Sequence, residues 1–194
     1  MDSFTKKLDE NVRSIQKDFR NDETLVVRSF ENQVEPLMKC CLVYMDGMVN
    51  SQQIDAYILK PIIEYQCKIT EKNPDFIHMI KKKIVLSNDV ELTSDPDEME
   101  QAVLYGDSVL LADGSDQALI LNTKGWTTRA TTEPENEKVM RGPREGFNES
   151  LMENLSMLRR RLQTRELCIE FNRFGTRSKT RGCICYVKPL VKKK

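Results

Sequence analysis

Residues 40–49 begin with an unbroken apolar run. Such a run is typical of a β-strand that is covered on both faces of its sheet. Residues 24–30 are rich in β-branched side chains and predict a second strand. Between them, residues 33–39 include Pro36 and are too long for a two-residue hairpin, so they predict a compact crossover. The two strands are therefore expected to lie parallel in one sheet.

Helical spacing is clearest near the start of the chain. The apolar stripe over residues 3–19 consists of Phe4, Leu8, Val12, Ile15 and Phe19. Steps of three and four residues predict an amphipathic helix that needs an apolar surface to lie on.

Capping and turn residues place further elements. Asn50 can cap a helix that Pro61 kinks, and Asp95-Pro96 and Gly106 bracket another helix. Apolar runs at 108–113 and 117–122 flank an Asp-Gly-Ser-Asp sequence and predict a β-hairpin.

The charge of the chain is divided although its formal net charge is zero. Residues 1–128 carry 14 Lys and Arg against 22 Asp and Glu, and residues 129–194 carry 16 against 8. Two parts of opposite sign can attract each other and dock. A chain of 194 residues has room for one ordinary domain or two small ones, and this division favours two.

The expected fold class is α/β with two small subdomains. The first, residues 1–128, is predicted to be a mixed, mainly parallel sheet covered by helices. Residues 129–141 are poor in large apolar side chains and form the predicted linker. The second subdomain, residues 142–194, is predicted to hold one helix and two strands, at 167–174 and 181–187. Such a thin core is expected either to dock on the first subdomain or to be completed by further elements of a longer protein.

The sequence does not point to an enzyme. It has no GxSxG, HExxH or glycine-rich phosphate loop, and His78 is its single histidine. The six cysteines include no CxxC pair, so we expect reduced, mostly buried thiols and no metal site or cofactor. Cys183 and Cys185 share one face of a predicted strand, for which packing is favoured over metal binding.

The basic second part raises the question of an anionic partner. Basic residues interleave with aromatic ones on one predicted strand only, so nucleic acid is not an expected partner. Acidic protein surfaces, within the chain or on a neighbouring subunit, and lipid headgroups remain. Arg159 and Arg160 are candidate interface residues for such contacts.

Three stretches resemble one known family. Residues 133–151, with Arg141-Gly142-Pro143-Arg144-Glu145 at their centre, are similar to a signature of the A subunits of bacterial spore germinant receptors, the GerA family. Residues 42–49, which contain a strand that ends in the Asp46-Gly47 turn, and residues 106–114 also resemble family segments. The likeness covers most of residues 4–187.

The resemblance implies a soluble domain cut from a longer membrane protein. The intact protein would sit in the spore inner membrane, with this domain on the cytoplasmic, spore-core side. Its expected role is non-enzymatic: assembly with other receptor subunits and copies of itself, and transmission of the nutrient signal during germination. The membrane contact would lie in a C-terminal part that is absent here.

Two sets of site residues follow. Arg141, Gly142, Pro143, Arg144 and Glu145 suit a hinge clamp, because glycines permit tight turns and arginines grip carboxylates in bidentate fashion; capping of the following helix is the alternative.

The other set is the Asp46-Gly47 turn at the end of a predicted strand. It would line the mouth of a cleft between the two subdomains if the domain itself binds a small molecule such as the nutrient germinant.

Overall fold

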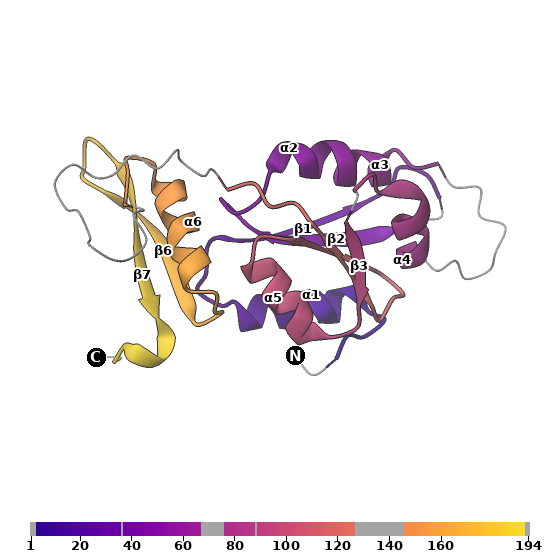
Figure 1. The fold of residues 1–194 in the computed structure, drawn as a ribbon, viewed down its shortest axis with the longest axis horizontal. Helices are drawn as coiled ribbons and strands as arrows, with labels where there is room; N and C mark the ends of the chain where they lie inside the picture. The colour runs from indigo at the N-terminus through magenta and orange to yellow at the C-terminus, as the bar shows by residue number, and fades with distance from the viewer. Residues whose placement is uncertain (1–2, 36, 67–75, 88, 127–145, 193–194) are drawn as a thin grey trace.

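A computed structural model describes residues 3–35, 37–66, 76–87, 89–126 and 146–192. They form an α/β structure with two sheets (Figure 1). The larger sheet has five strands in the order β1-β2-β4-β5-β3. Its strands are β1 (Leu25–Glu31), β2 (Lys39–Met45), β3 (Val90–Thr93), β4 (Ser108–Ala112) and β5 (Ala118–Leu121). The α/β class is as predicted.

The predicted parallel arrangement is wrong, because every neighbouring pair in this sheet is antiparallel. β1 and β2 pair from Leu25 opposite Met45 to Glu31 opposite Lys39. The connection between them is a loop that turns back on itself: the Asn32 side chain accepts the N–H of Met38 at 2.6 Å. A parallel crossover needs a dozen or more residues, and this segment is shorter.

Helices cover both faces of the larger sheet, which explains the apolar run in β2. On one face lie α2 (Ser51–Ile54), η1 (Asp55–Leu59), α3 (Lys60–Ile63), α4 (Phe76–Met79) and η2 (Ile80–Ile84), and on the other lie α1 (Leu8–Asp18) and α5 (Pro96–Leu104) (Figure 1). Cys40 and Leu42 pack in the first core, and Cys41 and Val43 pack in the second. The apolar run in β2 indicates that both faces of the sheet are covered, and it carries no information on the direction of the strands.

The predicted helices are found with shorter bounds. The stripe of α1 lies on the sheet, with Ile15 and Phe19 buried and Val12 half-buried. Asn50 caps α2 by accepting the N–H of Gln53 at 3.1 Å, and the helix passes through a π-turn before Pro61. Asp95 caps α5 as expected, and the hairpin of β4 and β5 is confirmed.

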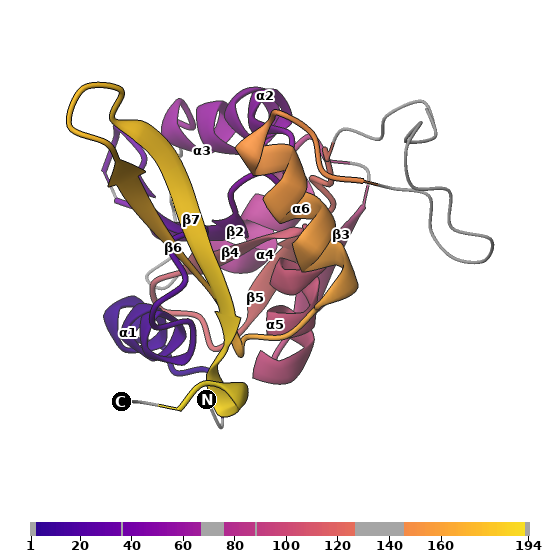
Figure 2. The same ribbon diagram turned by 90° about the vertical axis from the view of Figure 1, so that its left-hand side faces the viewer.

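The smaller sheet is a hairpin of β6 (Leu167–Phe174) and β7 (Thr180–Val187), followed by the short helix η3 (Lys188–Leu190). The helix α6 (Leu151–Arg161) covers one face of this sheet, where its Leu155 packs with Leu167 and Ile169 of β6. Figure 2 shows α6, β6 and β7 lying across one end of the larger unit. The subdomain boundaries stay a prediction, and the expected linker, residues 129–141, lies outside the described residues.

None of the helices in the described part of the chain is both long enough and apolar enough to cross a bilayer.

Candidate functional site

The β6–β7 unit is hydrogen-bonded to the turn that precedes β1. Asp22 forms an isolated parallel bridge with Ile169, and the N–H of Glu23 donates to the carbonyl of Ile169 at 2.9 Å. The Glu23 carboxylate accepts the N–H of Phe171 at 2.5 Å. We call this contact the seam; it comprises residues 22–24, the turn at 46–48, and the residues of α6 and β6 that face them.

Arg159 is the buried centre of the seam. It lies one helical turn after Leu155, on the face of α6 that points inward, and only 2% of its surface is exposed. Its guanidinium pairs with the Asp22 carboxylate and donates to the carbonyl of Thr164 at 3.1 Å. Burial lowers the pKa of Arg159 from its ordinary value, and the charge of Asp22 opposes that shift.

Asp22 is held in place from its own side of the seam. Its carboxylate accepts the hydroxyl of Thr24 at 2.6 Å and the N–H of the same residue at 3.1 Å. The ion pair with Arg159 therefore joins a side chain fixed on the larger unit to one fixed on α6. Residues 137 apart in sequence meet here.

A second contact borders the seam. The guanidinium of Arg160 lies 5.7 Å from the ring centre of Trp126, and Trp126 packs edge-on against Tyr105 with ring centres 6.0 Å apart. Lys124 lies 4.8 Å from the ring centre of Tyr105 and pairs with Asp107 at 2.5 Å. This chain of rings and cations links α6 to the larger sheet.

The predicted ligand residues Asp46 and Gly47 lie at the seam. Gly47 has a φ of +80°, and a Cβ built on it would stand 3.2 Å from the Met152 side chain of α6. Asp46 is exposed, and its N–H donates to the carbonyl of Thr24 at 2.8 Å. Where this turn faces Leu155 and Arg159, the space between the two units has no room for a water molecule. The structure therefore brings these residues to a closed contact.

The predicted hinge clamp, Arg141 to Glu145, lies outside the described residues. Of the other candidates, Arg159 is buried and Arg160 lies beside it at the border of the seam. Sequence reasoning missed Asp22 and Trp126. Asp22 gave one weak signal, an acidic residue in the break between a helix and a strand, and Trp126 gave none.

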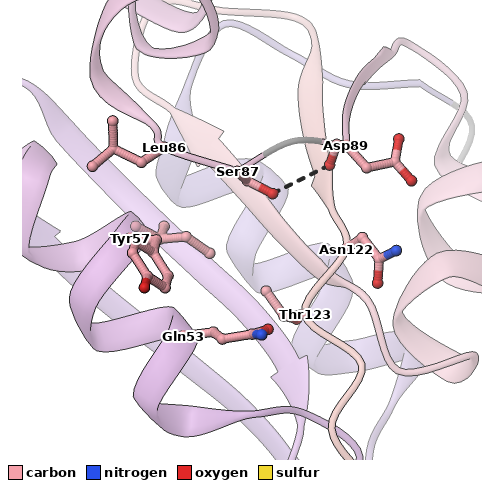
Figure 3. Close-up of a pocket in the computed structure, with 8 residues that line it drawn as sticks. Gln53, Tyr57, Leu86, Ser87, Asp89, Asn122 and Thr123 are labelled. Carbon is pink, nitrogen blue, oxygen red and sulfur yellow. Dashed lines mark hydrogen bonds between the residues drawn. The ribbon is translucent and has the colours of Figure 1, made fainter.

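An open pocket of about 450 Å³ lies elsewhere, on the α2 side of the larger sheet (Figure 3). Its walls come from α2 and η1, from the loop before β3, and from the two residues that follow β5. The lining residues are Gln53, Tyr57, Ile58, Leu86, Ser87, Asp89, Asn122 and Thr123. Most of these carry amide, hydroxyl or carboxylate groups, so the pocket offers hydrogen bonds to a small polar molecule.

The pocket is shaped by Pro61. Proline has no N–H to donate to the carbonyl four residues earlier, which belongs to Tyr57. That carbonyl instead accepts the N–H of Leu86 at 3.2 Å. The missing helical hydrogen bond thereby fixes the loop that forms one wall. Thr123, at the floor, shares a hydrogen bond of 2.7 Å with the buried Ser108 hydroxyl.

The thiols of Cys40 and Cys41 offer little reactivity. Burial raises the pKa of Cys40 to about 12 and that of Cys41 to about 11, so both are protonated at neutral pH and behave as core residues. The sulfurs of Cys183 and Cys185 lie 3.7 Å apart on one face of β7, as their spacing predicted. Among the described residues, no third Cys, His, Asp or Glu joins them to make a group that could hold a metal ion.

Comparison with known proteins defines the class of this fold. The family model described as Bacillus/Clostridium GerA spore germination protein matches residues 13–194, which is most of the chain. The chain belongs to the GerA family of spore germination proteins.

Particular relatives agree with this assignment. Spore germination protein KA of Bacillus subtilis (strain 168) is 26% identical over 187 residues, which are 96% of this chain and 34% of that protein. The uncharacterized membrane protein YfkQ of the same strain is 32% identical over 150 residues, which are 77% of this chain and 28% of that protein. The chain thus spans about a third or less of the length of these relatives.

A solved structure has the same fold. It is the crystal structure of the N-terminal domain of the A subunit of the Bacillus megaterium spore germinant receptor GerK3. The likeness has a TM-score of 0.76 at 24% sequence identity and covers 98% of this chain and 68% of that one.

Proposed function

We propose that this chain is the N-terminal region of a germinant receptor A subunit and acts, without catalysis, in receptor assembly and in transmission of the nutrient signal. The intact subunit would reside in the spore inner membrane, with this region on the spore-core side. The relatives reported above are named for spore germination or as a membrane protein, and the solved structure belongs to a germinant receptor. Partners are then other receptor subunits and further copies of this one.

The observation that carries the proposal is the seam. Arg159 and Asp22 form a buried ion pair, and backbone hydrogen bonds at Ile169 add to it. A contact of this kind passes a displacement of one unit to the other, because separating the two charges leaves each one buried and unpaired. A binding event that displaces one unit can therefore displace the other unit as well.

Assembly can be tested in the intact receptor. A photo-crosslinking residue placed at Arg141 or Arg144 is expected to form covalent adducts with a neighbouring receptor subunit in spore membranes, because these residues suit a clamp on a carboxylate surface. Gel mobility and mass spectrometry of the adducts would identify the partner.

The matched control for this experiment is the same probe at Arg13, an exposed arginine on α1. It is expected to yield few adducts with other subunits. If neither Arg141 nor Arg144 gave subunit adducts, or if the yield at Arg13 were equal to theirs, the clamp role would be refuted.

A second candidate function is small-molecule binding, favoured by the pocket of Figure 3. Its volume of about 450 Å³ and its hydrogen-bonding walls suit an amino acid or a small sugar. Because the space between the turn at 46–48 and α6 has no room for a water molecule, this pocket is a better location for a ligand than the cleft expected from the sequence.

Ligand-dependent melting tests the pocket. The 194-residue chain would be heated with amino acids, sugars and inorganic ions, and a ligand at one hundred times its dissociation constant is expected to add about 2.7 kcal/mol to the free energy of unfolding. Gln53→Ala removes an amide from the wall and is expected to reduce the shift in Tm.

The control for the pocket is Gln52→Ala, which changes an exposed neighbouring glutamine that does not line it. It is expected to leave the ligand-dependent shift unchanged. If no compound shifted the Tm of the unaltered chain, or if both glutamine variants responded alike, the pocket would not be the binding site.

A further inference from the structure

The distal half of the β6–β7 hairpin carries unopposed positive charge. Residues 171–182 contain four Lys and Arg and no Asp or Glu. The four are Arg173, Arg177, Lys179 and Arg181, and all are exposed. Within the part of the chain that the structure describes, none of them forms an ion pair with a carboxylate. We call residues 171–184 the arm; Figure 1 shows its turn at one end of the molecule, remote from β3.

Two of these charges oppose each other. Arg173 and Arg181 are directly paired across the two strands. Like charges in this position destabilise a hairpin. The guanidinium of Arg181 lies 4.1 Å from the ring centre of Phe171, which holds it in place without neutralising it. An arrangement that costs folding energy and leaves two cations side by side is well suited to an external anion.

The opposite face of the arm carries two exposed apolar side chains. Phe174 and Ile184 are each 52% exposed. The register places both on the face of the hairpin away from α6, because the residues that alternate with them, Phe171 and Cys183, pack towards that helix. A Cβ on Gly182 would stand 2.7 Å from the Phe174 ring, so the ring lies across the strand at this glycine. The two apolar side chains therefore form one strip that solvent reaches.

We propose that the arm docks on an anionic lipid surface, with its cations among the headgroups and Phe174 at the boundary of the acyl chains. An exposed aromatic and an exposed aliphatic side chain in a short segment that also carries several Lys and Arg are the composition of interfacial membrane contacts. A narrow hairpin tip can enter a fluid headgroup layer, whereas a flat protein partner would need a broader matching surface. The proposal rests on the proposed function only in that it requires a membrane beside the domain.

Nucleic acid fits the arm less well. Recognition of single strands uses several aromatic rings on which successive bases stack. On the arm, the Phe171 ring is covered by Arg181, which leaves Phe174 as its one exposed ring. The arm thus offers positive charge together with one exposed aromatic ring. This combination suits a lipid surface better than a strand of stacked bases.

Vesicle flotation with the 194-residue chain tests the proposal. The chain is expected to float with vesicles of equal parts phosphatidylglycerol and phosphatidylcholine, to stay behind with pure phosphatidylcholine, and to be released as salt is raised. Arg177→Gln with Lys179→Gln is expected to weaken partitioning about 25-fold, since each charge near the surface contributes about a fivefold factor. Phe174→Ser is expected to weaken it about tenfold.

Each variant has a matched control. Lys82→Gln with Lys83→Gln removes two exposed charges from η2, and Leu190→Ser removes an apolar side chain that is 81% exposed at the other end of the hairpin. Both controls are expected to float like the unaltered chain. Circular dichroism would confirm that all variants are folded.

Three results would overturn the proposal. The first is that the unaltered chain does not float with phosphatidylglycerol vesicles. The second is that the controls lose as much binding as the arm variants. The third is that the arm variants keep vesicle binding but lose binding to single-stranded DNA or polyglutamate, which would assign the arm to another partner. None of these results bears on the crosslinks expected at Arg141 and Arg144, so the two proposals can fail separately.

Discussion

Arg159→Ala is expected to lower the free energy of unfolding by about 3–5 kcal/mol, because it leaves the Asp22 carboxylate buried without its counter-charge. The loss should appear as a lower midpoint in urea denaturation, followed by circular dichroism. In the double variant Asp22→Ala with Arg159→Ala, no unpaired charge remains. Its loss is therefore expected to be clearly smaller than the sum of the two single losses.

Arg165 provides the control for this prediction. It also pairs with a carboxylate of the larger unit, Glu100 on α5, at 2.9 Å, but its side chain is 47% exposed. Arg165→Ala is expected to cost at most about 1 kcal/mol, since exposed pairs are screened by water. Equal losses for the two arginine variants would show that the seam is not a buried electrostatic contact.

Gly125→Ala is expected to cost about 3 kcal/mol through a clash with backbone. A Cβ at this position would stand 2.4 Å from the backbone nitrogen of Asn50, which no flexible side chain can relieve. Asn50 caps α2, and α2 carries Gln53 of the pocket. The substitution should therefore both lower the Tm and reduce any ligand-dependent shift.

Gly114→Ala separates the clash from the effect of backbone conformation. Gly114 has a φ of +83°, and nothing lies within 4 Å of a Cβ built on it. Alanine there is expected to lower the free energy of unfolding by about 1 kcal/mol, which is the cost of the left-handed backbone conformation alone. If Gly125→Ala proved no more destabilising than Gly114→Ala, the close approach of Gly125 to the backbone of Asn50 would be refuted.

The local elements were largely predictable. The stripe of α1, the caps at Asn50 and Asp95, and the hairpin of β4 and β5 all appear where residue spacing placed them. Cys183 and Cys185 share one face of β7, as the alternation of side chains along a strand predicted. Each of these inferences depends on residues only a few positions apart, whose relative geometry the backbone dictates.

The candidate site was predictable only in part. Arg159 and Arg160 were singled out for their charge, but the sequence could not show that one is buried against Asp22 and the other lies beside Trp126. The pocket of Figure 3 was not foreseen, because its walls come from three separate segments. No local pattern marks such a convergence.

The amino-acid sequence by itself determined the family, the helices and hairpins, and the division of charge, since these follow from residue identity and short-range spacing. Tertiary structure decided the direction of β1 relative to β2, because an apolar run reports burial on two faces and is the same for parallel and antiparallel strands. It also decided the partner of Arg159, which lies 137 residues away. Only the packing of α6 against the turn before β1 brings those two charges together.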